Sequence, residues 1–142
     1  MQPDFLFLLI NYGILLPWTL LIVAPRWSVT RRATSSAVFP VVLGLGYAAV
    51  FTLAPTPPTG GDLETIRTFL GSPWGATIMW IHAVAFDLFV GAWIVRDAQR
   101  RSIPHLAVVP CLLGTLMLGP VGLLAFLGLR AVRRTGTGLH ES

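Results

Sequence analysis

The chain has 142 residues, of which 54% are hydrophobic and 11% are charged, and its mean hydropathy is +0.73. Soluble domains carry about 25% charged residues, so this composition excludes an ordinary water-soluble fold and favours an integral membrane protein. The net charge is +4, and every basic residue is arginine. Nucleic-acid binding is not expected, because the arginines flank apolar segments in short clusters and form no basic face with interleaved aromatic residues.

The apolar segments, taken in chain order, predict an all-α integral membrane protein with a bundle of about four transmembrane helices, since a crossing needs roughly 20 mostly apolar residues. The predicted spans are residues 5–25, 38–54, 74–95 and 104–129. The second and third spans are separated by a Pro- and Gly-rich segment, which is followed by a short interfacial helix at 63–70. Residues 1–134 are expected to form one transmembrane domain, followed by a flexible polar tail at 135–142.

The ends of these spans predict how the chain is oriented. No cleavable signal peptide is expected, because the N-terminus has no basic region and the first apolar run is long enough to span. With four spans and the N-terminus outside, six of the ten arginines are cytoplasmic, a weak preference under the positive-inside rule. The Gly119-Pro120 pair interrupts the last apolar segment. If it folds that segment into a re-entrant hairpin, nine arginines become cytoplasmic, so both arrangements of the C-terminus stay open.

His82 and Asp87 are ionisable residues inside the third predicted span, which makes them the candidate catalytic residues. A charge at the centre of a helix in lipid costs about 2.5–3.5 kcal/mol on insertion scales, so such residues normally face the bundle interior. Their separation of five residues points them about 140° apart, so each is expected to meet a partner from another helix. They either act on an apolar substrate, as acid and base or as metal ligands, or belong to a hydrogen-bond network that packs the helices.

Three further residues are candidates for binding a ligand near this position. Counting residues along alternating spans places Asn11 and Tyr47 at the depth of His82, so we predict that these three share one polar pocket, with Asp87 deeper. Trp80 lies two residues before His82 and is deep enough to line a pocket for a polyene or sterol-like ligand, although plain packing is the favoured explanation.

Asp97 and His105 flank the predicted loop after the third span, where we expect them to meet or to bind a ligand. No metal site is predicted, because no pair of His, Asp or Glu residues has the i, i+3 or i, i+4 spacing of helical metal sites. Cys111 is the single cysteine, so no disulfide within the chain is expected. No cofactor is identified, because Walker, dinucleotide-binding and CxxC motifs are absent from the sequence.

Three segments of the chain resemble the ABA4-like family of small multi-span membrane proteins: NYGILLPWTLLIVAPRW, WIHAVAFDLFVGAWIVRDAQRRSIPH and PCLLGTLMLGPVGLL. In that family, the plant protein is tied to neoxanthin formation from violaxanthin in chloroplast membranes, an isomerisation that opens an epoxide to an allene. The resemblance therefore implies a carotenoid-like apolar substrate. It also marks as candidates the residues on the polar positions of these segments, namely Asn11, His82, Asp87, Arg96, Asp97 and His105.

Two functions from different classes fit the sequence. One is a membrane isomerase, or a related enzyme, that acts on a carotenoid-like lipid through buried polar residues. The other is a membrane protein without enzymatic activity that binds a lipid or a protein partner and uses those residues for helix packing. Because the sequence shows no Ser-rich transit peptide, we expect a bacterial-type member of the family, located in the inner membrane.

Overall fold

The computed structural model describes residues 2–35, 38–54 and 59–133, and these residues form α-helices and no strand. The predicted polar tail at 135–142 lies outside the described residues. In chain order the helices are α1 (Pro3–Gly13), α2 (Leu15–Val23), α3 (Ser28–Ser35), α4 (Val38–Leu53), α5 (Leu63–Gly71), α6 (Pro73–Arg100), α7 (His105–Leu118) and α8 (Pro120–Val132). The predicted all-α fold is confirmed.

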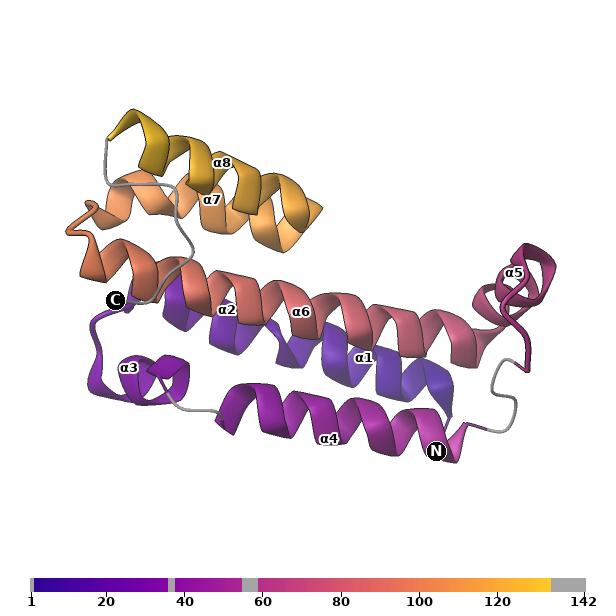
Figure 1. Cartoon of the computed structure of the whole chain (residues 1–142). Helices are drawn as coiled ribbons and strands as arrows, with labels where there is room; N and C mark the ends of the chain where they lie inside the picture. Colours follow the sequence, from indigo (N-terminus) through magenta and orange to yellow (C-terminus); the bar gives the residue numbers. More distant parts are fainter. Residues whose placement is uncertain (1, 36–37, 55–58, 134–142) are drawn as a thin grey trace.

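Helix α6 is the centre of the structure, and each of the other described helices packs against it (Figure 1). Its 28 residues extend over about 42 Å at 1.5 Å per residue. It begins where Ser72 accepts a hydrogen bond from the backbone N–H of Gly75 at 3.0 Å, with Pro73 in the first turn. The core lies on its faces toward α2, α7 and α8, where Trp18, Leu112 and Phe126 are almost fully buried.

Only two helical stretches of the described chain are both long and apolar enough to cross a membrane. They are Pro3–Val23, which combines α1 and α2, and Pro73–Arg100, which is α6. The apolar helices α4, α7 and α8 are shorter, so the predicted bundle of four spans is not confirmed.

Helix α5 is present as predicted, and it begins at Asp62, whose carboxylate accepts hydrogen bonds from the hydroxyl and the backbone N–H of Thr65. These two bonds lower the pKa of Asp62.

The last predicted span, at 104–129, is divided at the Gly119-Pro120 pair, where the sequence left a crossing and a re-entrant hairpin open. Helices α7 and α8 are separate, pack against each other and form an antiparallel hairpin (Figure 1). Gly119 makes the turn with a φ of 52°, a backbone conformation that L side chains rarely adopt, and Pro120 begins α8. With 14 and 13 residues, each helix is about 20 Å long, which is shorter than the hydrocarbon core of roughly 30 Å.

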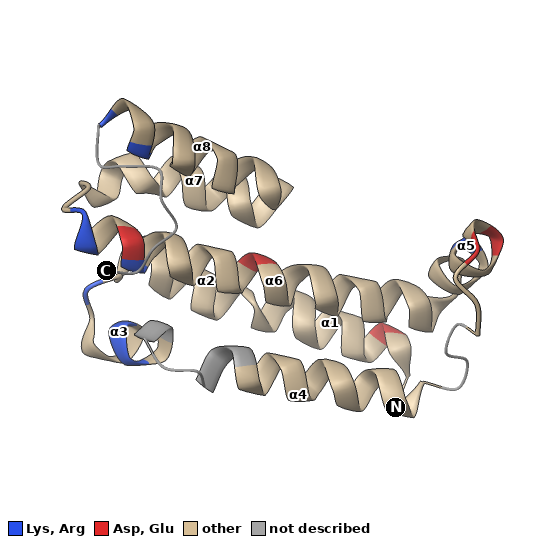
Figure 2. Cartoon of the chain, in the orientation of Figure 1, with Lys and Arg blue, Asp and Glu red and all other residues tan. Residues whose placement is uncertain are grey.

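Most of the described arginines lie at one end of the molecule, and the hairpin returns Arg130 and Arg133 to that end (Figure 2). Eight of the nine arginines in the described ranges lie at this end. They are found in the turn before α3, in α3, in or just after the last turns of α6, and at the end of α8. Arg67 lies in α5 at the opposite end. The acidic residues Asp4, Asp62 and Glu64 lie at the end that carries α5 and the N-terminus. The fold is therefore polarised along the α6 axis.

We expect Gly122→Ala to destabilise the protein. A Cβ at Gly122 would lie 2.0 Å from the backbone nitrogen of Thr115 and 2.5 Å from the carbonyl oxygen of Cys111, so α7 and α8 would have to separate. Overpacking of this kind costs about 1–3 kcal/mol. The measurement is thermal unfolding in detergent, followed by circular dichroism.

Gly128→Ala in the same helix is the matched control, because a Cβ there meets nothing within 4 Å. Alanine favours a helix over glycine by about 0.5–1 kcal/mol, so this variant should melt at or above the wild-type temperature. Equal melting temperatures for the two variants would contradict the close approach of α7 to α8.

Candidate functional site

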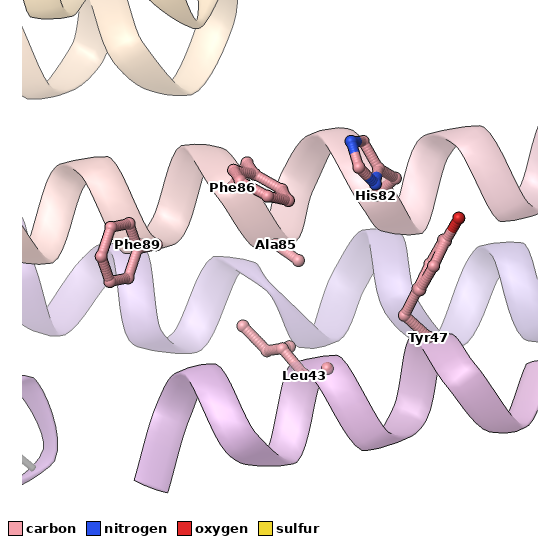
Figure 3. Close-up of a pocket in the computed structure, with 7 residues that line it drawn as sticks. Leu43, Tyr47, His82, Ala85, Phe86 and Phe89 are labelled. Atoms are coloured by element: carbon pink, nitrogen blue, oxygen red, sulfur yellow. The ribbon is translucent and has the colours of Figure 1, made fainter. Parts of the chain in front are cut away.

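An apolar groove lies between α4 and α6 and has a volume of about 400 Å³. Figure 3 shows the lining side chains on the two neighbouring helices, with Tyr47 extending from α4 toward α6. The lining consists of Leu43, Gly44 and Tyr47 from α4 and of His82, Ala85, Phe86 and Phe89 from α6. This volume falls in the range of small-molecule sites, which are about 300–1,000 Å³ and mostly apolar.

Helical periodicity explains why these residues share the groove. On α6, positions 82, 85, 86 and 89 are spaced by three and four residues, which places them on one face. On α4, Leu43 and Tyr47 are four residues apart, and Gly44 beside them has no side chain to fill the space. The groove is thus formed by aromatic side chains around a gap that glycine leaves open.

The polar side chains of the groove are His82 and Tyr47, and they lie next to each other. Their ring centroids are 5.5 Å apart with an angle of 59° between the planes, and the ring of Phe86 lies 4.8 Å from His82 on its own helix. Figure 3 shows the phenol of Tyr47 reaching from α4 toward the imidazole of His82. Among the residues that the structure describes, no carboxyl group lines the groove, so an imidazole and a phenol are its proton-exchanging groups.

The structure places Asp87 elsewhere, against the turn of the α7–α8 hairpin. Its Oδ1 atom is 2.9 Å from the position that a Cβ on Gly119 would occupy. Asp87 is absent from the lining of the groove that contains His82. The two candidate catalytic residues therefore face different neighbours, as their angular separation on one helix predicts, and they form no acid–base pair around one cavity.

Among the other candidates, only Tyr47 lies with His82. Asn11 on α1 is half-buried but does not line the groove. Trp80 points to α1, where its ring packs against that of Phe7 with centroids 5.7 Å apart. Residue counting gives the depth of a side chain but not the neighbour that it faces. Of the predicted pocket of Asn11, Tyr47 and His82, only Tyr47 and His82 therefore lie together.

Asp97 and His105 do not meet. Asp97 is buried, and its Oδ2 atom lies 3.0 Å from Nε of Arg101 and 3.5 Å from Nε of Arg130. The Nε2 atom of His105 lies 2.7 Å from the carbonyl oxygen of Ile22, so this nitrogen donates the hydrogen bond. Each residue thus fixes a different helix end, since Asp97 holds α8 and His105 holds α2.

Arg130 is a residue that the sequence-based prediction treated only as a flanking charge. Its side chain is fully buried, and its Cζ atom lies 5.8 Å from the ring centroid of Trp93. The spacing in α8 contains a signal for this burial, because the buried residues Gly122, Phe126 and Arg130 follow one another at intervals of four.

Within the described residues, no group of three or more His, Cys, Asp or Glu is placed to hold a metal ion.

These features define an all-helical protein with an aromatic-lined apolar groove and one basic end. The chain belongs to the ABA DEFICIENT 4-like family, whose model matches residues 5–126. It is similar to the protein ABA DEFICIENT 4, chloroplastic, of Arabidopsis thaliana, with 26% identity over 126 residues that cover 81% of this chain. The chain spans about half the length of that relative, of which 56% is covered. No solved structure matches.

We expect Asp97→Ala to destabilise the fold strongly. The substitution removes the carboxylate that faces the fully buried guanidinium of Arg130. Loss of one partner from a buried ion pair costs about 3–5 kcal/mol. The measurement is thermal or chemical unfolding in detergent, compared with the double variant Asp97→Ala/Arg130→Met, which should recover part of the loss.

Glu64→Ala is the control for this prediction. Glu64 also pairs with an arginine, Arg67, at 3.3 Å, but both side chains are more than 70% exposed. Exposed pairs contribute about 0–1 kcal/mol, so the control should melt close to wild type. Similar losses in Asp97→Ala and Glu64→Ala would contradict a buried ion pair between α6 and α8.

Proposed function

We propose that the protein is a multi-pass membrane protein that binds a carotenoid-like apolar lipid in the α4–α6 groove and isomerises it. The observation that carries this proposal is the pairing of His82 with Tyr47 inside a groove whose other lining residues are apolar. Family membership supports the class of ligand, because the relative in Arabidopsis is named for abscisic-acid deficiency and for the chloroplast, and the family resemblance implies carotenoid chemistry.

The outer surface of the helices supports a location in lipid. Large apolar side chains stay exposed along the helices, including Leu16 at 69%, Leu45 at 66% and Phe86 at 59%. A soluble monomer rarely exposes apolar patches larger than a few hundred Å². In our proposal, the combined α1–α2 stretch, α4 and α6 cross the membrane, while the α7–α8 hairpin enters and returns on the arginine side.

The groove is open to a ligand that arrives sideways from the bilayer. Phe86 and Phe89 line it and are 59% and 48% exposed, so they contact both the groove and the surroundings of the bundle. A volume of about 400 Å³ takes one end of a long polyene. The remainder would extend along α6 in the hydrocarbon, where it needs no further protein contact.

An epoxide-to-allene isomerisation needs one proton donated and one removed, with no net oxidation. In this proposal, the Tyr47 hydroxyl donates its proton to the epoxide oxygen as the C–O bond breaks. The His82 imidazole takes the proton from the polyene carbon, so the C–H electron pair forms the new double bond. Return of that proton from His82 to the Tyr47 phenolate restores both groups. A positioned acid or base contributes about 10²–10⁴-fold to the rate.

The second candidate is a lipid-binding protein without enzymatic activity. The position of Asp87 favours it, because the one carboxyl group in the middle of α6 lies against the hairpin turn and outside the groove. In this case, Asp87 serves helix packing while His82 and Tyr47 contact a polar end of the lipid.

We expect expression in a bacterial host that makes violaxanthin to give a new isomeric carotenoid. His82→Phe keeps an aromatic ring of similar shape but has no basic nitrogen, and it should lower product formation at least about 100-fold. Asp87→Asn is the control outside the groove and should keep the product. Pigment profiling by chromatography is the measurement. Violaxanthin that copurifies unchanged with the wild type would favour the second candidate, and neither product nor bound pigment would contradict both.

A topology test checks the membrane arrangement separately. Three crossings and a hairpin place the N-terminus and the C-terminus on opposite sides, with the C-terminus on the arginine side, which the positive-inside rule assigns to the cytoplasm. Fusions of a reporter that is active only in the cytoplasm should therefore be active at the C-terminus and inactive at the N-terminus. Equal activity at both ends would instead support four crossings.

A further inference from the structure

A second cavity lies at the arginine-rich end, between the α2–α3 turn and the α6–α7 turn, and has a volume of about 550 Å³. It is separate from the groove that contains His82, and the two share no lining residue. Its polar lining comes from Arg26, Arg31, Gln99, Ser102 and His105. The function proposed above does not use this cavity.

Two contacts between residues far apart in the sequence fix the shape of the cavity. The Nε2 atom of Gln99 donates to the carbonyl oxygen of Pro25 at 3.0 Å, and Nε2 of His105 donates to that of Ile22 at 2.7 Å. Together they tie the C-terminal end of α2 to both sides of the α6–α7 turn. The arginines of the α2–α3 segment are therefore held beside this turn and do not depend on a ligand for their approach.

The cavity is positively charged. Arg26 and Arg31 line it, and within the described ranges of the chain no carboxyl group does. The nearest acidic residue along α6 is Asp97, which faces Arg101 and Arg130 instead. Guanidinium groups present planar forks of N–H donors that match the oxygens of a phosphate group.

We propose that this basic cavity binds the phosphate group of an anionic membrane lipid. It lies where the combined α1–α2 stretch and α6 end, which is the level of the headgroups if the chain crosses a membrane as proposed above. Basic pockets between membrane helices bind anionic headgroups by the same chemistry. The cavity volume exceeds that of a bare phosphate ion and suits a headgroup with its glycerol. The inference rests on the proposed membrane location and not on the proposed isomerisation.

The test is native mass spectrometry of the full chain purified in dodecyl maltoside. The probes are dioleoyl phosphatidylglycerol, dioleoyl phosphatidylcholine, which has the same phosphate but no net charge, and inorganic phosphate. We expect the wild type to retain phosphatidylglycerol preferentially. Arg26→Gln and Arg31→Gln should each weaken this retention about fivefold, since one arginine near an anionic headgroup contributes about a factor of five.

Arg133→Gln is the matched control, because this arginine is exposed after α8 and does not line the cavity. Arg26→Lys keeps the charge and should retain more lipid than Arg26→Gln, which gives a second readout. Equal weakening by Arg133→Gln, or equal retention of phosphatidylcholine, would overturn the proposal. If inorganic phosphate displaced phosphatidylglycerol at a similar concentration, the cavity would be a site for free phosphate, and the proposal of a lipid headgroup would be overturned.

Fractionation of the expressing cells separates this inference from the proposal on which it rests. Protein recovered in the membrane fraction without selectivity for phosphatidylglycerol would overturn the headgroup site alone. Protein recovered without detergent in the soluble fraction would overturn the membrane location itself. Neither result depends on whether a carotenoid is converted.

Discussion

The buried ion pair between Asp97 and Arg130 is the interaction that fixes the hairpin on the central helix. Arg130 is fully buried at the end of α8, and Asp97 lies at the end of α6. An unpaired charge at such a site is costly, so α8 must return to the end of α6 that carries Asp97. At the other end of the hairpin, the turn at Gly119 lies against Asp87 in the middle of α6. The hairpin therefore covers only one half of α6.

The uncovered part of α6 is where the groove forms. With α7 and α8 on one face, the groove forms on the face that carries His82 and Phe86, where its described lining residues come from α4 and α6 and Gly44 leaves space between them. The same arrangement separates the two ionisable residues of α6, because Asp87 faces the hairpin and His82 faces the groove. A carboxylate that faces the hairpin turn and an imidazole that lines the groove thus lie within five residues of each other on one helix.

The polarity of the molecule follows from the hairpin as well. One continuous last helix would carry its terminal arginines to the end that has α5, whereas the return at Gly119 gathers them with the arginines of α3 and α6. The basic cavity between the α2–α3 and α6–α7 turns lies at this end. An apolar groove and a basic cavity at different levels along α6 fit the proposed membrane location.

The sequence by itself determined the helical class, the position of α5, the long third apolar helix and the break at Gly119-Pro120. These features depend on local chemistry, such as apolar periodicity, the cap at Asp62 and the missing N–H of proline. Only the tertiary structure decided that α7 and α8 fold back, that Tyr47 and not Asn11 lies beside His82, and that Arg130 is buried against Asp97. Periodicity relates residues on one helix to each other, but it does not fix how two helices rotate about their axes, and that rotation decides which side chains meet.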